Sequence, residues 1–149
     1  MDVALSNALI DRDWEDFTTQ VGRLKLGWPE RDGTRIDVVV TAPGTTEQFR
    51  AALLCDDYDA IAPVLDFADL ADPALLGRVH WPNIEGAPYN SVTYDGRYLP
   101  ILCVVGTRGY HIHSSHSAEQ HPKSSWRLPV VASRLHWFLR MGRLVGRGV

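Results

Sequence analysis

The chain has 149 residues, of which 45% are hydrophobic and 22% charged, a composition that suits one globular domain over residues 1–149. Its formal net charge of -3 provides no overall positive field, so we expect no nucleic-acid partner. The N-terminus lacks the basic and then apolar order of a secretion signal, and no apolar run approaches the roughly 18 residues that span a bilayer. We therefore expect a cytoplasmic protein without a membrane partner.

The first predicted element is an amphipathic helix over residues 11–26. Four apolar side chains recur at spacings of three and four: Trp14, Phe17, Val21 and Leu24. This spacing places them on one face of a helix. Gly27 and Pro29 follow and are expected to end the helix.

Three antiparallel strands are predicted next, over residues 36–41, 49–54 and 62–67. The first is rich in β-branched residues and follows a turn at Asp32-Gly33. The third alternates apolar and polar positions and has Pro63 near its start, which is typical of an edge strand. The three segments are expected to form a meander.

Residues 69–98 are rich in proline and glycine, so we predict a long structured loop with a short strand or extended piece around residues 79–84. A closing helix is expected to begin near Pro129, and Gly142 and Gly146 are expected to fray its end. The predicted fold class is therefore α+β: an N-terminal helix, an antiparallel meander, a long loop and a C-terminal helix.

Cys103 is the main candidate for chemistry, since it ends the apolar run of residues 99–102 and is followed by Gly106 and several histidines. A thiolate is the reactive form of cysteine, and a nearby base or cation lowers the thiol pKa from its usual value of about 8.5. The alternative is a small buried hydrophobic residue. Cys55 lacks such neighbours, so we expect it to pack in the core or at the surface. Without a C-x-x-C pair, both thiols are expected to be free.

His111, His113 and His116 form an H-x-H-x-x-H pattern that would suit three ligands of a zinc ion. The pattern contains no Asp or Glu that would act as a base, and serines around it suggest an exposed loop. We therefore favour acid–base roles in acyl transfer, with His111 assisting proton transfer and His113 beside it, and we expect no metal or cofactor. A surface loop with incidental histidines is the alternative.

Aromatic residues and His80 have plainer interpretations. Trp14, Trp126 and Trp137 are expected to be structural, because they fall on or near predicted helices. His80 is expected to fix the long loop by hydrogen bonding. The loop tyrosines would either line a channel or pack the loop onto itself: Tyr89, Tyr94 and Tyr98.

Five segments, taken in chain order, resemble the ubiquitin-conjugating enzymes, and specifically their divergent bacterial members. These segments are residues 49–54, Tyr58 with residues 62–67, the His-Trp-Pro-Asn-Ile sequence at 80–84, residues 99–103, and Trp126 followed by Pro129. Residues 99–103 are similar to the stretch that ends at the family's catalytic cysteine. Residues 80–84 are similar to the family's His-Pro-Asn-Ile motif, with a tryptophan inserted.

The resemblance implies a fold like that of the ubiquitin-conjugating domain, with an active-site loop before the C-terminal helix. It implies that Cys103 receives the C-terminus of a ubiquitin-like modifier from an E1-like activating enzyme and passes it to an amine of a protein substrate. Asn83 or a histidine would then polarise the carbonyl. Asn83 lies twenty residues before Cys103, farther than is usual in the family.

Two other functions remain open at this point. One is a catalytically inactive variant of the same fold that binds a modifier or another partner. The other is a zinc-dependent hydrolase built on His111, His113 and His116. Formation of a thioester would separate the conjugating enzyme from the first, and stoichiometric zinc would identify the second.

Overall fold

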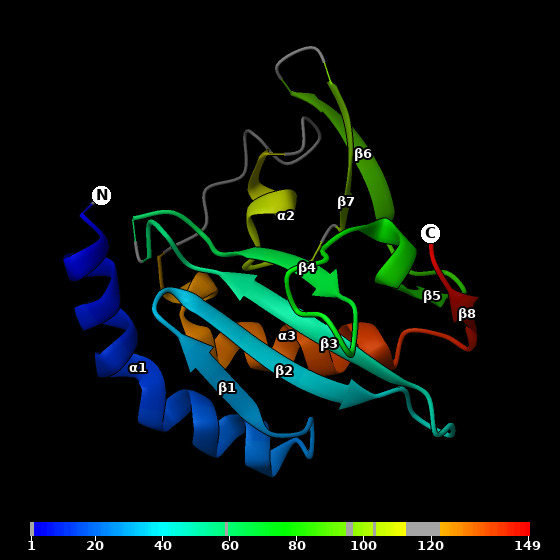
Figure 1. Ribbon diagram of the computed structural model, residues 1–149, viewed down its shortest axis with the longest axis horizontal. Coiled ribbons are helices and arrows are strands. Elements are labelled where there is room, and N and C mark those ends of the chain that lie inside the picture. Colours follow the sequence, from blue (N-terminus) through cyan, green and yellow to red (C-terminus); the bar gives the residue numbers. More distant parts are fainter. Residues whose placement is uncertain (1, 59, 95–96, 103, 113–122) are drawn as a thin grey trace.

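The computed structural model describes residues 2–58, 60–94, 97–102, 104–112 and 123–149. Helices α1 (Val3–Arg23) and α3 (Leu128–Leu139) pack against each other and against a four-stranded antiparallel sheet (Figure 1). This arrangement confirms the predicted α+β class with an N-terminal helix, an antiparallel meander and a C-terminal helix. No helix in the described ranges is long and apolar enough to cross a membrane.

Helix α1 begins eight residues earlier than predicted, at Val3, because Asp2 caps it. The Asp2 carboxylate accepts a hydrogen bond from the backbone N–H of Ala4 at 2.9 Å, which satisfies one of the free donors at a helix start. The helix ends at Arg23, three residues before the predicted end. Phe17 and Val21 are buried, as the helical spacing predicts.

The sheet consists of β1 (Pro29–Asp32), β2 (Arg35–Thr41), β3 (Gln48–Leu54) and β4 (Val64–Ala68), in that spatial order. The three predicted strands are confirmed as β2, β3 and β4, and β4 is an edge strand as expected. The prediction missed β1, which is mostly charged and shows no apolar alternation. It forms because Pro29 to Asp32 pair with β2 in register, which is a tertiary effect.

Alternation along the strands creates the core. Ile36, Val38 and Val40 of β2 point inward, and their partners Leu53, Ala51 and Phe49 on β3 are buried beside them. Since side chains alternate between the two faces of a strand, the residues between them lie on the outer face. Apolar residues of α1 and α3 join the inner face in one cluster.

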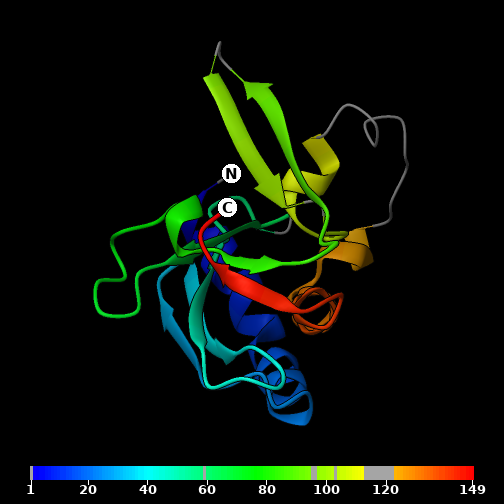
Figure 2. The same cartoon turned by 90° about the vertical axis from the view of Figure 1, so that its right-hand side faces the viewer.

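The turn-rich segment after β4 contains more regular structure than a long loop. It holds the short helix η1 (Arg78–His80) and the strands β5 (Pro82–Ile84), β6 (Tyr89–Tyr94) and β7 (Arg97–Leu102). The strands β6 and β7 form a two-stranded antiparallel hairpin that projects away from the main sheet (Figure 2). Two further short helices follow, α2 (Arg108–Ile112) and η2 (Lys123–Trp126).

The C-terminal region corrects one prediction. Gly142 and Gly146 do not fray the helix, because the chain turns after α3 into the strand β8 (Leu144–Arg147), which pairs with β5. A Cβ atom at Gly142 would overlap the carbonyl oxygen of Glu85, so the close approach of these two segments requires glycine. The chain at Gly142 and Gly146 therefore continues into a strand and does not fray.

Candidate functional site

Cys103 lies outside the described residues, but its neighbours along the chain are placed. It follows Leu102, the last residue of β7, and precedes Val104, which is buried. Thr107, also buried, closes a turn by donating its hydroxyl hydrogen to the Val104 carbonyl at 2.7 Å. Gly106 has a φ of +91°, a conformation that glycine adopts without strain. The segment after the cysteine is therefore tightly turned.

Helix α2 is fixed to the loop that leads into β4. The Arg108 N–H donates to the Pro63 carbonyl at 2.8 Å, and its Nε donates to the Ala62 carbonyl at 3.2 Å. The Arg108 guanidinium also lies 4.0 Å from the Asp57 carboxylate. Main-chain and side-chain bonds from one arginine thus hold the start of α2 against the body of the molecule.

His111 lies on α2, where aromatic rings support it. Its imidazole meets the Trp126 ring nearly edge to face, with centroids 5.1 Å apart and an angle of 73° between the planes. The neighbouring Tyr110 ring lies at 5.3 Å and 75°. Such contacts favour one ring orientation. The contacts with Tyr110 and Trp126 therefore fix the orientation of the His111 ring, and its role in proton transfer stays a prediction.

Trp126 is anchored through the residues that follow it. Arg127 forms hydrogen bonds to both carboxylate oxygens of Asp13, a residue of α1 with no exposed surface. The Tyr58 hydroxyl donates to the same carboxylate and accepts the Leu128 N–H at 3.0 Å. Asp13 thus joins α1, the β3–β4 connection and the start of α3.

Burial alone would raise the pKa of Asp13, because it disfavours the charged form. Hydrogen bonds from Arg12, Arg127 and Tyr58 outweigh this effect and hold the pKa well below its usual range. The Arg12 guanidinium contributes two of these bonds, at 2.8 and 3.0 Å. Asp13 is therefore a charged group at the centre of the support for Trp126.

Asn83 lies on β5, between the buried residues Pro82 and Ile84 and opposite Gly146 of β8. The ladder shifts register between Asn83 and Ile84, which is a bulge. Bulges often redirect a side chain next to a functional site. Asn83 is itself half-buried, so its amide sits at the surface of a well-fixed strand.

Tyr89 connects this strand to the segment before Cys103. Its hydroxyl accepts the Ile84 N–H at 2.9 Å and donates to the Pro82 carbonyl, so it clamps both sides of Asn83. In the hairpin register, Tyr89 is the partner of Leu102, the residue before Cys103. The hairpin therefore brings Leu102 back beside Tyr89, whose hydroxyl contacts the residues on both sides of Asn83.

Tyr89 also resolves one of the two interpretations left open for the loop tyrosines. Its ring packs edge to face on Phe138 of α3, with centroids 6.1 Å apart, and lies 6.3 Å from the Trp81 ring. It therefore packs the segment onto the core rather than lining a channel. No side-chain placement is described for Tyr94 and Tyr98.

The remaining predicted site residues divide into two groups. His80 lies on η1 with its Nδ1 atom 3.8 Å from the Asp69 carboxylate, a contact between η1 and the preceding loop. His113 and His116 lie outside the described residues. Within the part of the chain that the structure describes, no group of three His, Cys, Asp or Glu residues would hold a metal ion.

Cys55 is the second thiol, and the structure confirms that it packs in the core. It is 1% exposed, and burial raises the pKa of its thiol to about 12, with a further contribution from the Asp56 carboxylate. At neutral pH such a thiol carries almost no thiolate and is inert. This chemistry separates Cys55 from any nucleophilic role.

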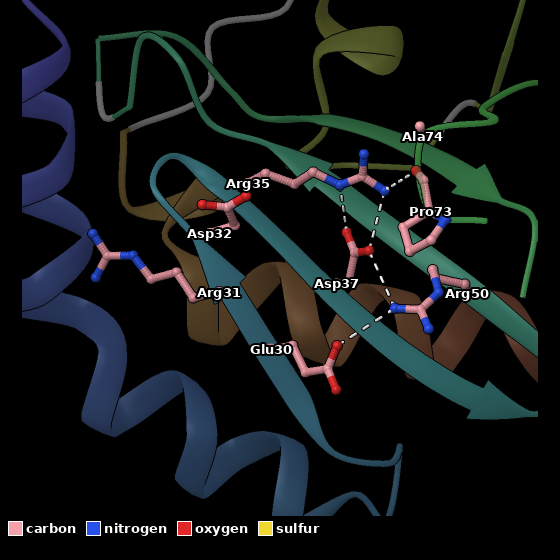
Figure 3. A pocket seen from close by; sticks show the side chains of 8 residues that line it. All are labelled: Glu30, Arg31, Asp32, Arg35, Asp37, Arg50, Pro73 and Ala74. Atoms are coloured by element: carbon pink, nitrogen blue, oxygen red, sulfur yellow. Dashed lines mark hydrogen bonds and ion pairs between the residues drawn. The ribbon is translucent and has the colours of Figure 1, made fainter. Parts of the chain in front are cut away.

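Sequence reasoning missed a charged cluster on the outer face of the sheet (Figure 3). Asp37 is 7% exposed and lies between Arg35, at 2.7 and 3.1 Å, and Arg50, at 3.3 Å. The same arginines donate to the Pro73 and Leu70 carbonyls, at 2.6 and 3.4 Å. Charged residues at alternate positions of β2 are the sequence signal that could have predicted this cluster. The cluster ties the loop after β4 to the sheet.

Comparison with known proteins adds no family to this description. No protein-family model matches the chain, and no curated protein matches it. The function of this chain is therefore inferred from its placed residues and from its sequence motifs.

Proposed function

We propose that this protein is a conjugating enzyme for a ubiquitin-like modifier, with Cys103 as the thioester nucleophile. The modifier would reach Cys103 from an E1-like activating enzyme and leave it for an amine of a protein substrate. The observation that carries the proposal is the β6–β7 register, in which Tyr89 pairs with Leu102 while its hydroxyl clamps the backbone around Asn83.

The hairpin supplies a reason for the unusual distance between Asn83 and Cys103 in the sequence. A hairpin returns the chain to its starting point, so residues added within it lengthen the sequence without separating its two ends. Asn83 precedes the hairpin and Cys103 follows it. The long spacing is thus compatible with an asparagine that acts beside the cysteine.

The order of elements also supports the proposal. An N-terminal helix, an antiparallel meander, a short strand at the His-Trp-Pro-Asn-Ile sequence and a later helix begun by a Trp-x-x-Pro sequence follow one another along the chain. These are the elements that the resemblance implies, in the same order. The contacts of Arg108 and Trp126 fix α2 and the ring of His111, the proposed base, which supports this role.

In the proposed transfer, every bond that forms replaces a bond that breaks, and no cofactor takes part. The thiolate of Cys103 attacks the activated carbonyl of the modifier, a thioester forms, and the activating group leaves. A substrate amine then attacks that carbonyl, the C–S bond breaks, and the thiolate is restored. His111, with His113 as the neighbouring candidate, would take the proton that the amine releases, and the Asn83 amide would donate a hydrogen bond to the developing oxyanion.

Reconstitution with a cognate modifier, its activating enzyme and ATP tests the proposal. Wild type and Cys55→Ala should form an adduct that thiol reductants cleave, whereas Cys103→Ala should form none. His111→Ala should charge normally but discharge to amines more slowly, by the order of 10²-fold that losing a positioned base costs.

Two results would contradict the assignment. An adduct retained in Cys103→Ala and lost in Cys55→Ala would move the nucleophile to the other thiol. The second result is one equivalent of tightly bound zinc that is lost when His111, His113 or His116 is replaced. If chelators also abolished the activity, the thioester mechanism would give way to a metal site.

A further inference from the structure

An apolar hollow of about 130 Å³ lies between α3 and the segment that follows Cys103. Val104 and Val105 form one side, Pro88 lies at the start of the hairpin, and Trp137 and Met141 border it from the helical side. Trp137 is 68% exposed and Met141 is 46% exposed. The expectation that Trp137 is a structural residue is therefore wrong.

These two side chains leave a large apolar area in water beside the hollow. A buried Trp contributes a large apolar area, so leaving one in water forgoes a substantial hydrophobic stabilisation. The inner side of α3 is already complete, because Leu135 and Phe138 lie in the core. Trp137 and Met141 thus form an exposed apolar surface on α3 that meets the core at Phe138, which also lines the hollow.

The charged residues nearest to Trp137 along the chain are both basic. Arg134 lines the hollow and Arg140 follows Trp137 by three residues, so both lie within about one helical turn of that ring. Residues 123–149 contain no Asp or Glu at all. Among the described residues, the Arg134 and Arg140 guanidiniums form no ion pair, whereas Arg143 is paired with Glu85 at 3.5 Å.

We infer that this surface, defined by Trp137, Met141, Arg134 and Arg140, docks an acidic protein segment that inserts one large apolar side chain into the hollow. An apolar centre with cations at its rim complements a partner with an apolar anchor and flanking carboxylates. Because Val104 and Val105 line the hollow, the bound segment would lie beside the chain neighbours of Cys103.

Two other occupants fit the charges less well. A second copy of this chain in a two-fold contact would bring Arg134 and Arg140 of one copy close to the same arginines of the other, which repel. An anionic membrane surface is generally recruited by a cluster of about four to eight basic residues, whereas two arginines flank this hollow. The concave shape also favours a single inserted side chain.

The test uses fluorescently labelled short peptides of Glu, Asp and Ser around one central Phe, with versions that carry Ser at the centre or Lys in place of the acids. Anisotropy should show binding of the acidic Phe peptide only, and the binding should weaken as salt is raised. Trp137→Ala should weaken it roughly 30-fold, the scale of an interface hot spot. Met141→Ala and Arg134→Glu should weaken it in the same direction.

The chain offers matched controls. Trp28 is 81% exposed and precedes β1, so Trp28→Ala removes an exposed tryptophan outside the hollow and should leave binding unchanged. Arg23→Glu is the equivalent charge control at the end of α1. Cys103→Ala should bind like wild type, so a failure of the thioester chemistry would be distinguishable from a failure of docking.

Several outcomes would overturn the inference. These are no binding by any acidic peptide that carries Phe, equal binding by Trp137→Ala, or binding that survives replacement of the acids by Lys. Binding to phosphatidylserine vesicles with the same dependence on Trp137, in place of peptide binding, would assign the surface to a membrane. A wild-type dimer that Trp137→Ala dissociates would assign it to a second copy.

Discussion

The body of this molecule and its β6–β7 hairpin are stabilised in different ways. In the body, β2 and β3 face α1 and α3 through rows of buried apolar residues, and the buried charge of Asp13 has three hydrogen-bonding partners. The hairpin is a separate two-stranded sheet. Two strands alone are marginally stable in water, so this one depends on its contacts with the body. Helix α2, which carries the candidate residue His111, contacts both regions, through β7 of the hairpin and β4 of the body.

A few side-chain contacts attach the hairpin and α2 to the body of the molecule. Tyr89 joins the hairpin to β5 and α3, Arg108 joins α2 to the loop before β4, and Trp126 supports His111. Loss of a body contact should therefore unfold the whole domain. Loss of one of these attachments should cost less stability and act more on the site.

Replacing Asp13 should produce the largest effect. Asp13→Ala removes the acceptor for Tyr58, Arg12 and Arg127, and we expect a loss of about 2 to 3 kcal/mol, since both arginines remain partly solvated. Urea denaturation measures it. Asp16→Ala, at an exposed position of the same helix, is the control. Equal losses in the two variants would contradict a central role for Asp13.

The lowered pKa of Asp13 also predicts that stability depends on pH. The folded state lowers the pKa of Asp13, so its ionised form contributes stability above the unfolded-state pKa of about 4 and loses it as the pH falls through the folded value. Wild type should thus lose stability in acid more steeply than Asp13→Asn. Parallel stability curves from neutral to acidic pH would argue against the pKa shift.

Gly142→Ala tests the junction between the body and β5. The added methyl group would overlap the Glu85 carbonyl, and the shift needed to relieve this should cost roughly 1 to 2 kcal/mol. Gly146→Ala is a matched control, because a Cβ there has no atom within 4 Å. Thermal unfolding of both proteins, monitored by circular dichroism, should separate them. A more stable Gly142→Ala would contradict the close approach.

Tyr89→Phe tests the attachment of the hairpin to β5, since it keeps the ring and removes the hydroxyl that clamps the backbone around Asn83. The expected loss of stability is about 1 kcal/mol, because the Ile84 N–H loses its partner. If the conjugating function holds, discharge of the thioester should slow by more than charging does. An effect on stability without any change in discharge would mean that the clamp is only structural.

The smallest predicted effect concerns His136 of α3. Burial and the nearby Arg140 charge lower its pKa, so it opposes protonation in the folded state. Stability should fall as the pH drops below the unfolded-state value of about 6.5. His136→Gln should flatten this part of the stability curve. A curve of unchanged slope between pH 5 and 7 would contradict the prediction.

Much of the body could be predicted because its signals are local. The spacing of Phe17 and Val21 indicated α1, and the β-branched run of β2 indicated a strand. The early start of α1 was missed because its first turns bury Ser6, whose hydroxyl donates to the Asp56 carbonyl at 2.7 Å. A contact between residues fifty positions apart leaves no periodic trace in the sequence.

The candidate site was less predictable, although one signal was available. Asp95 and Gly96 separate β6 from β7 in the sequence, and Asp-Gly is a strong hairpin signal between strand-forming residues. The many prolines and glycines of residues 69–98 favoured the prediction of a loop, so this hairpin signal was missed. The ring contact of His111 with Trp126 joins residues far apart in the chain, so no spacing rule would reveal it.

The strand that escaped prediction forms one border of the main sheet. A free border with apolar side chains is a template on which another molecule can add a strand, the first step of many aggregates. On β1 the side chains of Glu30, Arg31 and Asp32 are charged, and Pro29 lacks a backbone hydrogen to donate. The absence of apolar alternation that hides β1 in the sequence thus discourages aggregation through this border.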